Sequence, residues 1–385
     1  FPIDGTINSI NIGKGANSIA GNTVLGESAL DASVSGGNNT AIGKNALTAN
    51  TSATNNVAIG VSALEACTTS GANTAVGKDA LKSNTAANNV AIGVDSLQAN
   101  TSGTTNTAVG TFALQANTSA SNNTGVGYSS LLLNTTGTNN TAIGANSLDA
   151  CTTGSSNTAV GQDALGAATE ASNNTAVGHQ TLDAVTTGGD NTAIGKGALT
   201  SLSTGTQNQC MGVNAGVNLT TGGLNTAIGA FALGTCQSGG SNVAVGHDAL
   251  LNTTSSNNTA VGHESLESNS TGSANVAVGY RALQKNTTAS NNTAVGRLAL
   301  NKNTTATNNT ACGNASLEFN TIGSDNTAIG RIALNLNTEG GNNTAVGKSA
   351  LQSNTTGGSN SAVGEESFIS NTTGTNNCGL GTSAG

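Results

Sequence analysis

The sequence predicts an all-β protein, a parallel β-solenoid of about 22 coils with 17 residues in each coil. One unit repeats 22 times between Asn22 and Asn377, and typical copies are Asn-Thr-Ala-Val-Gly-x-x-Ala-Leu-x-x-Asn-Thr-Thr-Gly-x-Asn. Successive opening Asn residues are 17 apart, except after Asn73 and Asn242, where the spacing is 16. A short, strict period is typical of solenoids, in which each coil buries its apolar side against its neighbours.

Composition supports a thin solenoid over a globular domain. Aromatic residues make up 2% of the chain and charged residues 8%, and there is a single proline. These residues cannot fill a broad core, whereas a thin coil needs only a few apolar side chains. The formal charge of -8 argues against nucleic acid as a partner, and no apolar run is long enough for membrane insertion.

Two short strands are expected in each coil. Counting from the opening Asn, positions two to four (Thr-Ala-Val) alternate as a strand, with positions two and four on one face and position three on the other. Positions eight and nine, a small residue and then Leu in 19 copies, form the second strand. We expect positions two, four and nine to fill the interior. A helical alternative fails because Gly, Asn, Thr and β-branched residues dominate the unit.

The remaining positions predict corners. Position five is Gly in all 22 copies, which suits a corner with positive φ or close backbone approach. Positions 12 to 16 form a polar turn, and the Asn residues at positions one and 12 are expected to stack as amide ladders.

The chain is expected to have two parts. Residues 1–21 form an N-terminal cap or lead-in coil, and residues 22–385 form one continuous repeat region that stops within a unit. The chain begins without Met or a signal peptide, so we expect it to be processed or excerpted from a longer protein.

Several segments resemble a known family. Asn55-Asn56-Val57-Ala58-Ile59-Gly60 and the matching run from Asn88 to Gly93 are similar to the Asn-Ser-Val-Ala-Ile-Gly motif of YadA-like heads of trimeric autotransporter adhesins. The opening segment, residues 7–13, also resembles repeat-containing tail fibre-like proteins of phages and bacteria. The resemblance covers essentially the whole chain. It implies a β-roll built from three chains, in which Val57 and Ile59 point inward and Ala58 faces a neighbouring chain.

The small residue at position three predicts an interface between chains. If positions two and four fill the interior, position three must meet something else at close range, and a closed three-fold assembly would bury it. We therefore expect a homotrimer whose inter-chain face includes Ala58, Ala159, Ala176 and Ala193. The alternative is a monomeric solenoid whose second strand packs onto position three.

Long polar side chains gather at position six, directly after the corner Gly, and predict an outward edge. This edge is a candidate for contact with a receptor, either a cell-surface glycan or a protein. The alternatives are a solvated edge that prevents lateral association, and a metal site between His247 and His263. The candidate residues of this edge are Lys78, His179, Lys196, His247, His263, Tyr280, Arg297 and Arg331.

Neither catalysis nor a cofactor is expected. No Ser-His-Asp or Cys-His arrangement, phosphate-binding loop or paired carboxylates appear, and no Cys-x-x-Cys spacing supports a metal site. Cys67, Cys151 and Cys236 share position 12 but lie five coils apart, about 24 Å at strand spacing. That separation excludes a bridge within the chain. We expect buried thiols, with bridges between chains as the alternative.

These observations favour a structural and adhesive fibre shaft, of a phage tail fibre or a bacterial surface adhesin, that attaches to a host or surface. The expected location is extracellular, at the cell surface or on a virion. One alternative is a self-assembling extracellular filament joined end to end. Another is an ice-binding solenoid, against which stands the expectation that the position-two threonines share a face with core valines.

Overall fold

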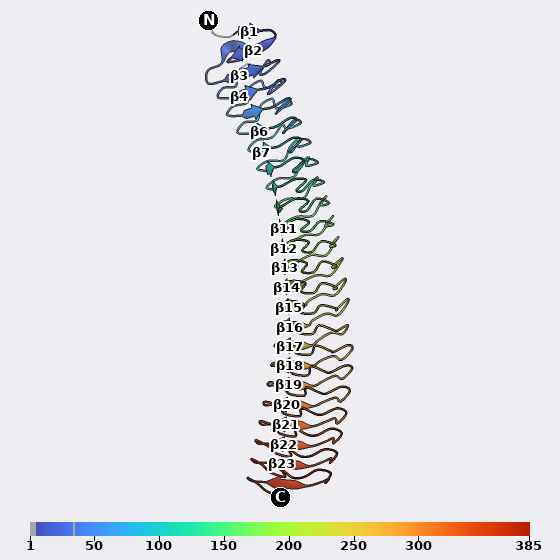
Figure 1. Ribbon diagram of the computed structural model, residues 1–385. Coiled ribbons are helices and arrows are strands. Elements are labelled where there is room, and N and C mark those ends of the chain that lie inside the picture. Colours follow the sequence, from blue (N-terminus) through green and yellow to red (C-terminus); the bar gives the residue numbers. More distant parts are fainter. Residues whose placement is uncertain (1–4, 34) are drawn as a thin grey trace. The chain divides into compact units, whose positions relative to one another are not determined.

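The computed structural model describes residues 5–33 and 35–385 and is a parallel β-solenoid with one turn per repeat unit (Figure 1). The chain divides into two compact units, Phe1–Asp190 and Asn191–Gly385. The described residues contain 24 strands, and the one short helix is a 3-10 turn, Ala16–Ser18. The predicted fold class is confirmed.

Every repeat contributes one strand of three or four residues. The strands of the first unit are β1 (Gly5–Ile7), β2 (Ile10–Gly13), β3 (Thr23–Gly26), β4 (Thr40–Ile42), β5 (Val57–Ile59), β6 (Thr74–Val76), β7 (Val90–Ile92), β8 (Thr107–Val109), β9 (Thr124–Val126), β10 (Thr141–Ile143), β11 (Thr158–Val160) and β12 (Thr175–Val177). The strands of the second unit are β13 (Thr192–Ile194), β14 (Gln209–Met211), β15 (Thr226–Ile228), β16 (Val243–Val245), β17 (Thr259–Val261), β18 (Val276–Val278), β19 (Thr293–Val295), β20 (Thr310–Cys312), β21 (Thr327–Ile329), β22 (Thr344–Val346), β23 (Ser361–Val363) and β24 (Cys378–Leu380).

Equivalent residues stack directly on one another. In the pair β11–β12, Thr158 lies opposite Thr175 and Ala159 opposite Ala176, and the strands are parallel. Within each unit the other repeat strands pair in the same register, so each position of the repeat becomes a column of similar side chains.

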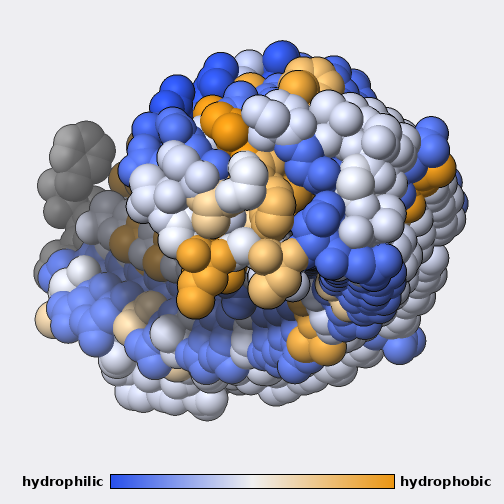
Figure 2. Space-filling view, turned by 90° about the horizontal axis from the view of Figure 1, so that it is seen from below, coloured by the Kyte–Doolittle hydropathy of each residue, from blue (hydrophilic) through white to orange (hydrophobic). Residues whose placement is uncertain are grey.

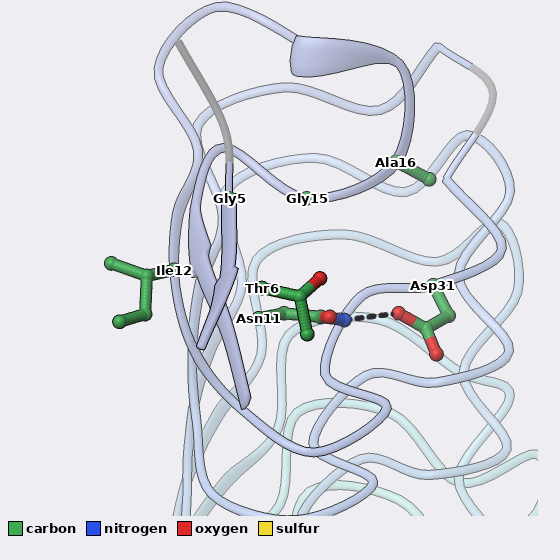
Figure 3. A pocket seen from close by; sticks show the side chains of 7 residues that line it. All are labelled: Gly5, Thr6, Asn11, Ile12, Gly15, Ala16 and Asp31. Carbon is green, nitrogen blue, oxygen red and sulfur yellow. Dashed lines mark hydrogen bonds between the residues drawn. The ribbon is translucent and has the colours of Figure 1, made fainter. Parts of the chain in front are cut away.

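The lead-in differs from the repeats. Strand β1 pairs with β2, and β2 with β3, and both pairings are antiparallel. A pocket of about 260 Å³ lies beside this hairpin. Thr6, Asn11 and Asp31 surround it, Ile12 points away from it, and the Asn11 amide donates a hydrogen bond to the Asp31 carboxylate (Figure 3).

The expected second strand does not form. At positions seven and nine the backbone is left-handed; Asp163 has φ 54° and Leu165 also has φ 54°. Extended strands need negative φ, so this segment is a series of turns. Its coils are still joined by hydrogen bonds, because the Leu165 N–H donates to the Thr181 carbonyl of the next coil at 3.0 Å.

The two faces of the strand are the reverse of the prediction. Position three points into the coil, and Ala58, Ala159, Ala176 and Ala193 are each fully buried within the single chain. They therefore cannot form the inter-chain face, and Ala58 does not face a neighbouring chain. Positions two and four point outward, so Val57 and Ile59, which were expected in the interior, are partly exposed.

The physical reason for this reversal is the width of the coil. Leu at position nine is fully buried in every repeat where it occurs, as at Leu148 and Leu165. This side chain fills most of a narrow interior, so the facing strand can present only a small residue. Position three is Ala because it lies inside the coil, opposite Leu.

The glycine corner is confirmed. Gly161 has φ +134°, and a Cβ placed there would lie 2.4 Å from the carbonyl oxygen of Gly178 in the next coil. Both the conformation and the close approach of two backbones exclude a side chain. Stacked glycines repeat this contact at equivalent corners of both units.

The amide ladders are also confirmed. At position one, the Asn140 N–H donates to Asn123 Oδ1 at 2.9 Å, and Asn123 Nδ2 donates to the Gly137 carbonyl at 2.8 Å. At position 12, Asn117 Nδ2 donates to Asn100 Oδ1 at 2.8 Å. These buried asparagines therefore bond both within and between coils, as buried polar groups require.

Candidate interaction surface

The outward face of the strands is a two-column surface that we call the sheet face. It consists of the residues at positions two and four of the repeats. Position two is mostly Thr or Val, and position four is mostly Val or Ile. At position four, Ile143 is 42% exposed and Ile194 is 41% exposed. The sheet face therefore presents methyl groups and threonine hydroxyls at the spacing of β-strands along each unit.

The threonines of this face have free hydroxyls. No hydrogen bond joins the hydroxyl of Thr158 or Thr175 to any described residue, whereas the threonines of position 13 donate to the next coil. The outward column at position two can therefore hydrogen-bond to a partner or to water.

The eight candidate edge residues at position six are all exposed. They do not form one cluster. Lys78 and Arg331 are isolated from the others, and His179 and Lys196 occupy the consecutive repeats that open at Asn174 and Asn191. The other four follow one another in consecutive coils of the second unit.

These four residues form a stack along the edge. The rings of His247 and His263 are parallel, with centroids 5.3 Å apart and an interplanar angle of 11°. The Tyr280 ring continues the stack at 5.8 Å from His263. The guanidinium groups of Arg281 and Arg297 lie 4.9 and 5.9 Å from the Tyr280 centroid, within the range of cation–π contact.

Acidic neighbours at position seven compensate this stack. The Nδ1 atom of His247 lies 2.9 Å from an Asp248 carboxylate oxygen, and Arg281 Nε donates to Glu264 at 2.6 Å. The hydrogen bond from Arg281 holds the pKa of Glu264 below its usual value. Because Glu264 pairs with Arg281 and Asp248 lies against His247, the stack resembles a solvated, internally paired edge more than a charged receptor site.

Metal binding has no support in this arrangement. No group of three or more His, Cys, Asp or Glu side chains in residues 5–33 and 35–385 could hold a metal ion.

None of the described helices is long and apolar enough to cross a membrane.

The six cysteines are free. Cys67, Cys151, Cys210 and Cys236 are buried, while Cys312 and Cys378 are exposed on the sheet face. Burial raises the pKa of the Cys67 and Cys151 thiols to about 11 and that of Cys210 to about 12. The buried thiols are therefore unreactive near neutral pH.

Hydrophobic side chains are not confined to the interior. Figure 2, which views the molecule from the C-terminal end, shows them in separate patches on a surface that is otherwise hydrophilic or neutral. On β24, Leu380 is 81% exposed.

A groove on the second unit was not predicted from the sequence. It has a volume of about 600 Å³ and runs between the columns of positions 11 and 13. Its walls include Lys285, Lys302 and Phe319. The available signal was a run of large side chains at position 11, where most other repeats have Ala, Ser, Thr or Asn.

Comparison of the chain with protein-family models, with curated proteins and with solved structures finds no match.

Proposed function

We propose that this chain is a shaft segment of a structural and adhesive fibre, of the kind found in phage tail fibres or bacterial surface adhesins, and that its copies associate through the sheet face. The observation that carries the proposal is the column of partly exposed Val and Ile at position four. Soluble monomers rarely expose long apolar strips, because such strips associate.

The occupant we propose for this face is a second and a third copy of the same chain. A closed three-fold assembly would bury the apolar column without leaving an open strip that recruits further chains. Equivalent coils of the three copies would then lie at the same height along the fibre. The position-four side chains of each copy would therefore contact side chains of the other copies that repeat at the same strand spacing. The resemblance to trimeric adhesin heads supports the number three, with the sheet face taking the place of the alanine face predicted from the sequence.

A rigid shaft suits attachment. Each coil is fixed to the next by strand hydrogen bonds and amide ladders, so the number of repeats sets the length of each unit. The fibre would hold its contacts with a host or surface outside the cell, at the cell surface or on a virion.

The proposal is tested with three glutamates on the sheet face. The variant Ile143→Glu, Val160→Glu and Val177→Glu changes position four in three consecutive coils, and light scattering should show dissociation to single chains that keep their circular dichroism spectrum. The matched control places glutamate at position six of the same coils, at Ala145, Gln162 and His179, and should remain associated. Equal masses for the unmodified chain and both variants would refute the interface.

Ice binding is a second candidate that the structure favours more than the sequence did. The sequence places the position-two threonines on one face with core valines, which would keep them from ice. Both columns instead face outward, with free threonine hydroxyls in a regular array. A thermal hysteresis assay on the single chain distinguishes the two candidates. An ice-binding protein should lower the freezing temperature below the melting temperature, whereas a fibre shaft should not.

A further inference from the structure

We propose that the groove on the second unit binds an acidic polysaccharide, which lies along the columns of positions 11 and 13. The inference names a ligand class for the attachment role and therefore rests on the proposed function. The groove is separate from both the sheet face and the edge at position six.

The groove is confined to a few coils. Position 11 is a small or short polar residue in most repeats, but Lys285, Lys302, Phe319 and Leu336 occupy it in four consecutive coils. The first three of these line the groove together with threonines of position 13. A volume of about 600 Å³ lies within the range of sites for small ligands and short segments of a polymer.

The charge of the groove favours an anion. Neither Lys285 nor Lys302 forms an ion pair with any described residue, although the chain as a whole carries a net charge of -8. Glu264, whose pKa is lowered by the Arg281 hydrogen bond and more weakly by the Lys285 charge, is itself paired with Arg281 at 2.6 Å. Glu267 accepts a hydrogen bond from Gln284 at 2.7 Å, and Glu318 accepts one from Asn335 at 3.2 Å. Two unpaired ammonium groups one coil apart are therefore available to an anionic ligand.

The threonines of the groove favour a ligand rich in hydroxyl donors. The hydroxyls of Thr287, Thr304 and Thr321 each donate to the carbonyl of the next coil at 3.0 to 3.1 Å. Their protons are thus already used, and only the oxygen lone pairs remain for a ligand. The exposed lining is mostly apolar, so a ligand packs chiefly on the threonine methyl groups and on Phe319, and where it reaches these oxygens it must donate to them, as sugar hydroxyls do.

Phe319 supplies an apolar surface at the same place. Phe319 is 41% exposed, so part of its ring is open to a ligand. A sugar ring presents a flat C–H face that packs on an aromatic ring, whereas an extended acidic peptide has no such face. Hydroxyl donors, negative charge and a flat apolar face occur together in polysaccharides that contain uronic acids.

The test measures binding of the full chain to hyaluronate, with dextran as the neutral saccharide and poly-L-glutamate as a polyanion without sugar rings. Hyaluronate should bind, and the pair Lys285→Ala and Lys302→Ala should weaken binding about tenfold or more. The matched pair Lys82→Ala and Lys348→Ala removes the same charge outside both the groove and the candidate edge residues, and should leave the affinity unchanged. Phe319→Ala should also weaken binding, and Phe319→Tyr should restore it.

The outcomes separate this inference from the fibre proposal. No binding of hyaluronate, equal binding of dextran or poly-L-glutamate, or equal losses in the two lysine pairs would overturn the groove assignment. The mass of the assembly in light scattering would be unaffected by any of these results. Conversely, a single-chain mass with hyaluronate still bound would overturn the fibre proposal and leave the groove assignment standing.

Discussion

The amide ladder at position 12 gives a prediction whose size follows from counting buried acceptors. In the first unit the ladder runs through Asn84, Asn100, Asn117 and Asn134, and it ends there because the next coil has Cys151. As a result, the Oδ1 atom of Asn134 is buried without a hydrogen-bond partner. The end of the ladder therefore differs from its middle by one unsatisfied oxygen.

Replacing Asn117 with Ala removes three hydrogen bonds. Its Nδ2 donates to Asn100 Oδ1 at 2.8 Å and to the Ala120 carbonyl at 3.1 Å, and its Oδ1 accepts from Asn134 at 2.9 Å. The Ala120 carbonyl keeps a second donor, Asn106, at 2.8 Å. One new acceptor, Asn100 Oδ1, is left buried and unsatisfied.

Replacing Asn134 with Ala removes two hydrogen bonds and leaves the number of unsatisfied oxygens unchanged. Asn117 Oδ1 loses its donor, but the unsatisfied Asn134 Oδ1 is removed with the side chain. The Gly137 carbonyl keeps its bond from Asn123 at 2.8 Å. Asn117→Ala should therefore cost about 1–3 kcal/mol more than Asn134→Ala, the usual cost of one orphaned buried acceptor.

The assay is native-state hydrogen exchange of the full chain, read by mass spectrometry over peptides within residues 106–140. Local exchange is the suitable readout because coils of a solenoid open in contiguous groups, so a global melting temperature averages over many of them. The two variants delete the same side-chain volume from the same column, which makes each a control for the other. Protection that falls equally in both variants, or further in Asn134→Ala, would refute the reasoning.

Three further predictions follow from the direction of the side chains and from one ion pair. Leu165→Asp should unfold several neighbouring coils, because it buries an unpaired charge, whereas Val160→Asp on the sheet face should leave the circular dichroism of the single chain intact; equal losses would contradict the inward and outward assignments. In protein dissociated to single chains, a thiol reagent at neutral pH should label Cys312 and Cys378 rapidly and the four buried cysteines only after unfolding, as peptide mapping would show. Since Arg281 lowers the pKa of Glu264 in the folded state, the pair stabilises the protein above the usual glutamate pKa, and this stabilisation is lost as the pH falls through the lowered value. Glu264→Gln should therefore reduce hydrogen-exchange protection of the coils around residues 264–281 at pH 7 but not below the lowered pKa of Glu264, with rates normalised to unfolded peptide at each pH; a difference that persists in acid would argue against the ion pair as its source.

Much of the coil could be predicted from the period alone. The corner at Gly161, the ladders of position one and position 12, and the absence of a bridge between Cys67 and Cys151 all follow from stacking identical units. Each of these features depends only on the repeat and the strand spacing, whichever way a side chain points.

The direction of the strand could not be predicted in the same way. Alternation at positions two, three and four defines two faces, but it does not say which face is inside. Broad cores hold the larger side chains, and positions two and four are expected inside for that reason. In a coil this narrow, Leu165 alone fills the space, and the facing Ala159 is small because it is inside.

The second strand and the groove were missed for different reasons. Position nine has a left-handed backbone, which is rare for Leu. The residue types at this position therefore do not indicate it. The groove depends on departures from the repeat, Lys285, Lys302 and Phe319, which a consensus of all units conceals. A search for large residues at positions that are usually small would have found it.

The most direct test of the central claim is the mass of the unmodified chain in solution, measured by sedimentation equilibrium at micromolar concentrations. If the sheet face is an interface between copies, the mass should be three times that of the 37.1 kDa chain. A mass of 37.1 kDa over the whole concentration range would contradict association through this face.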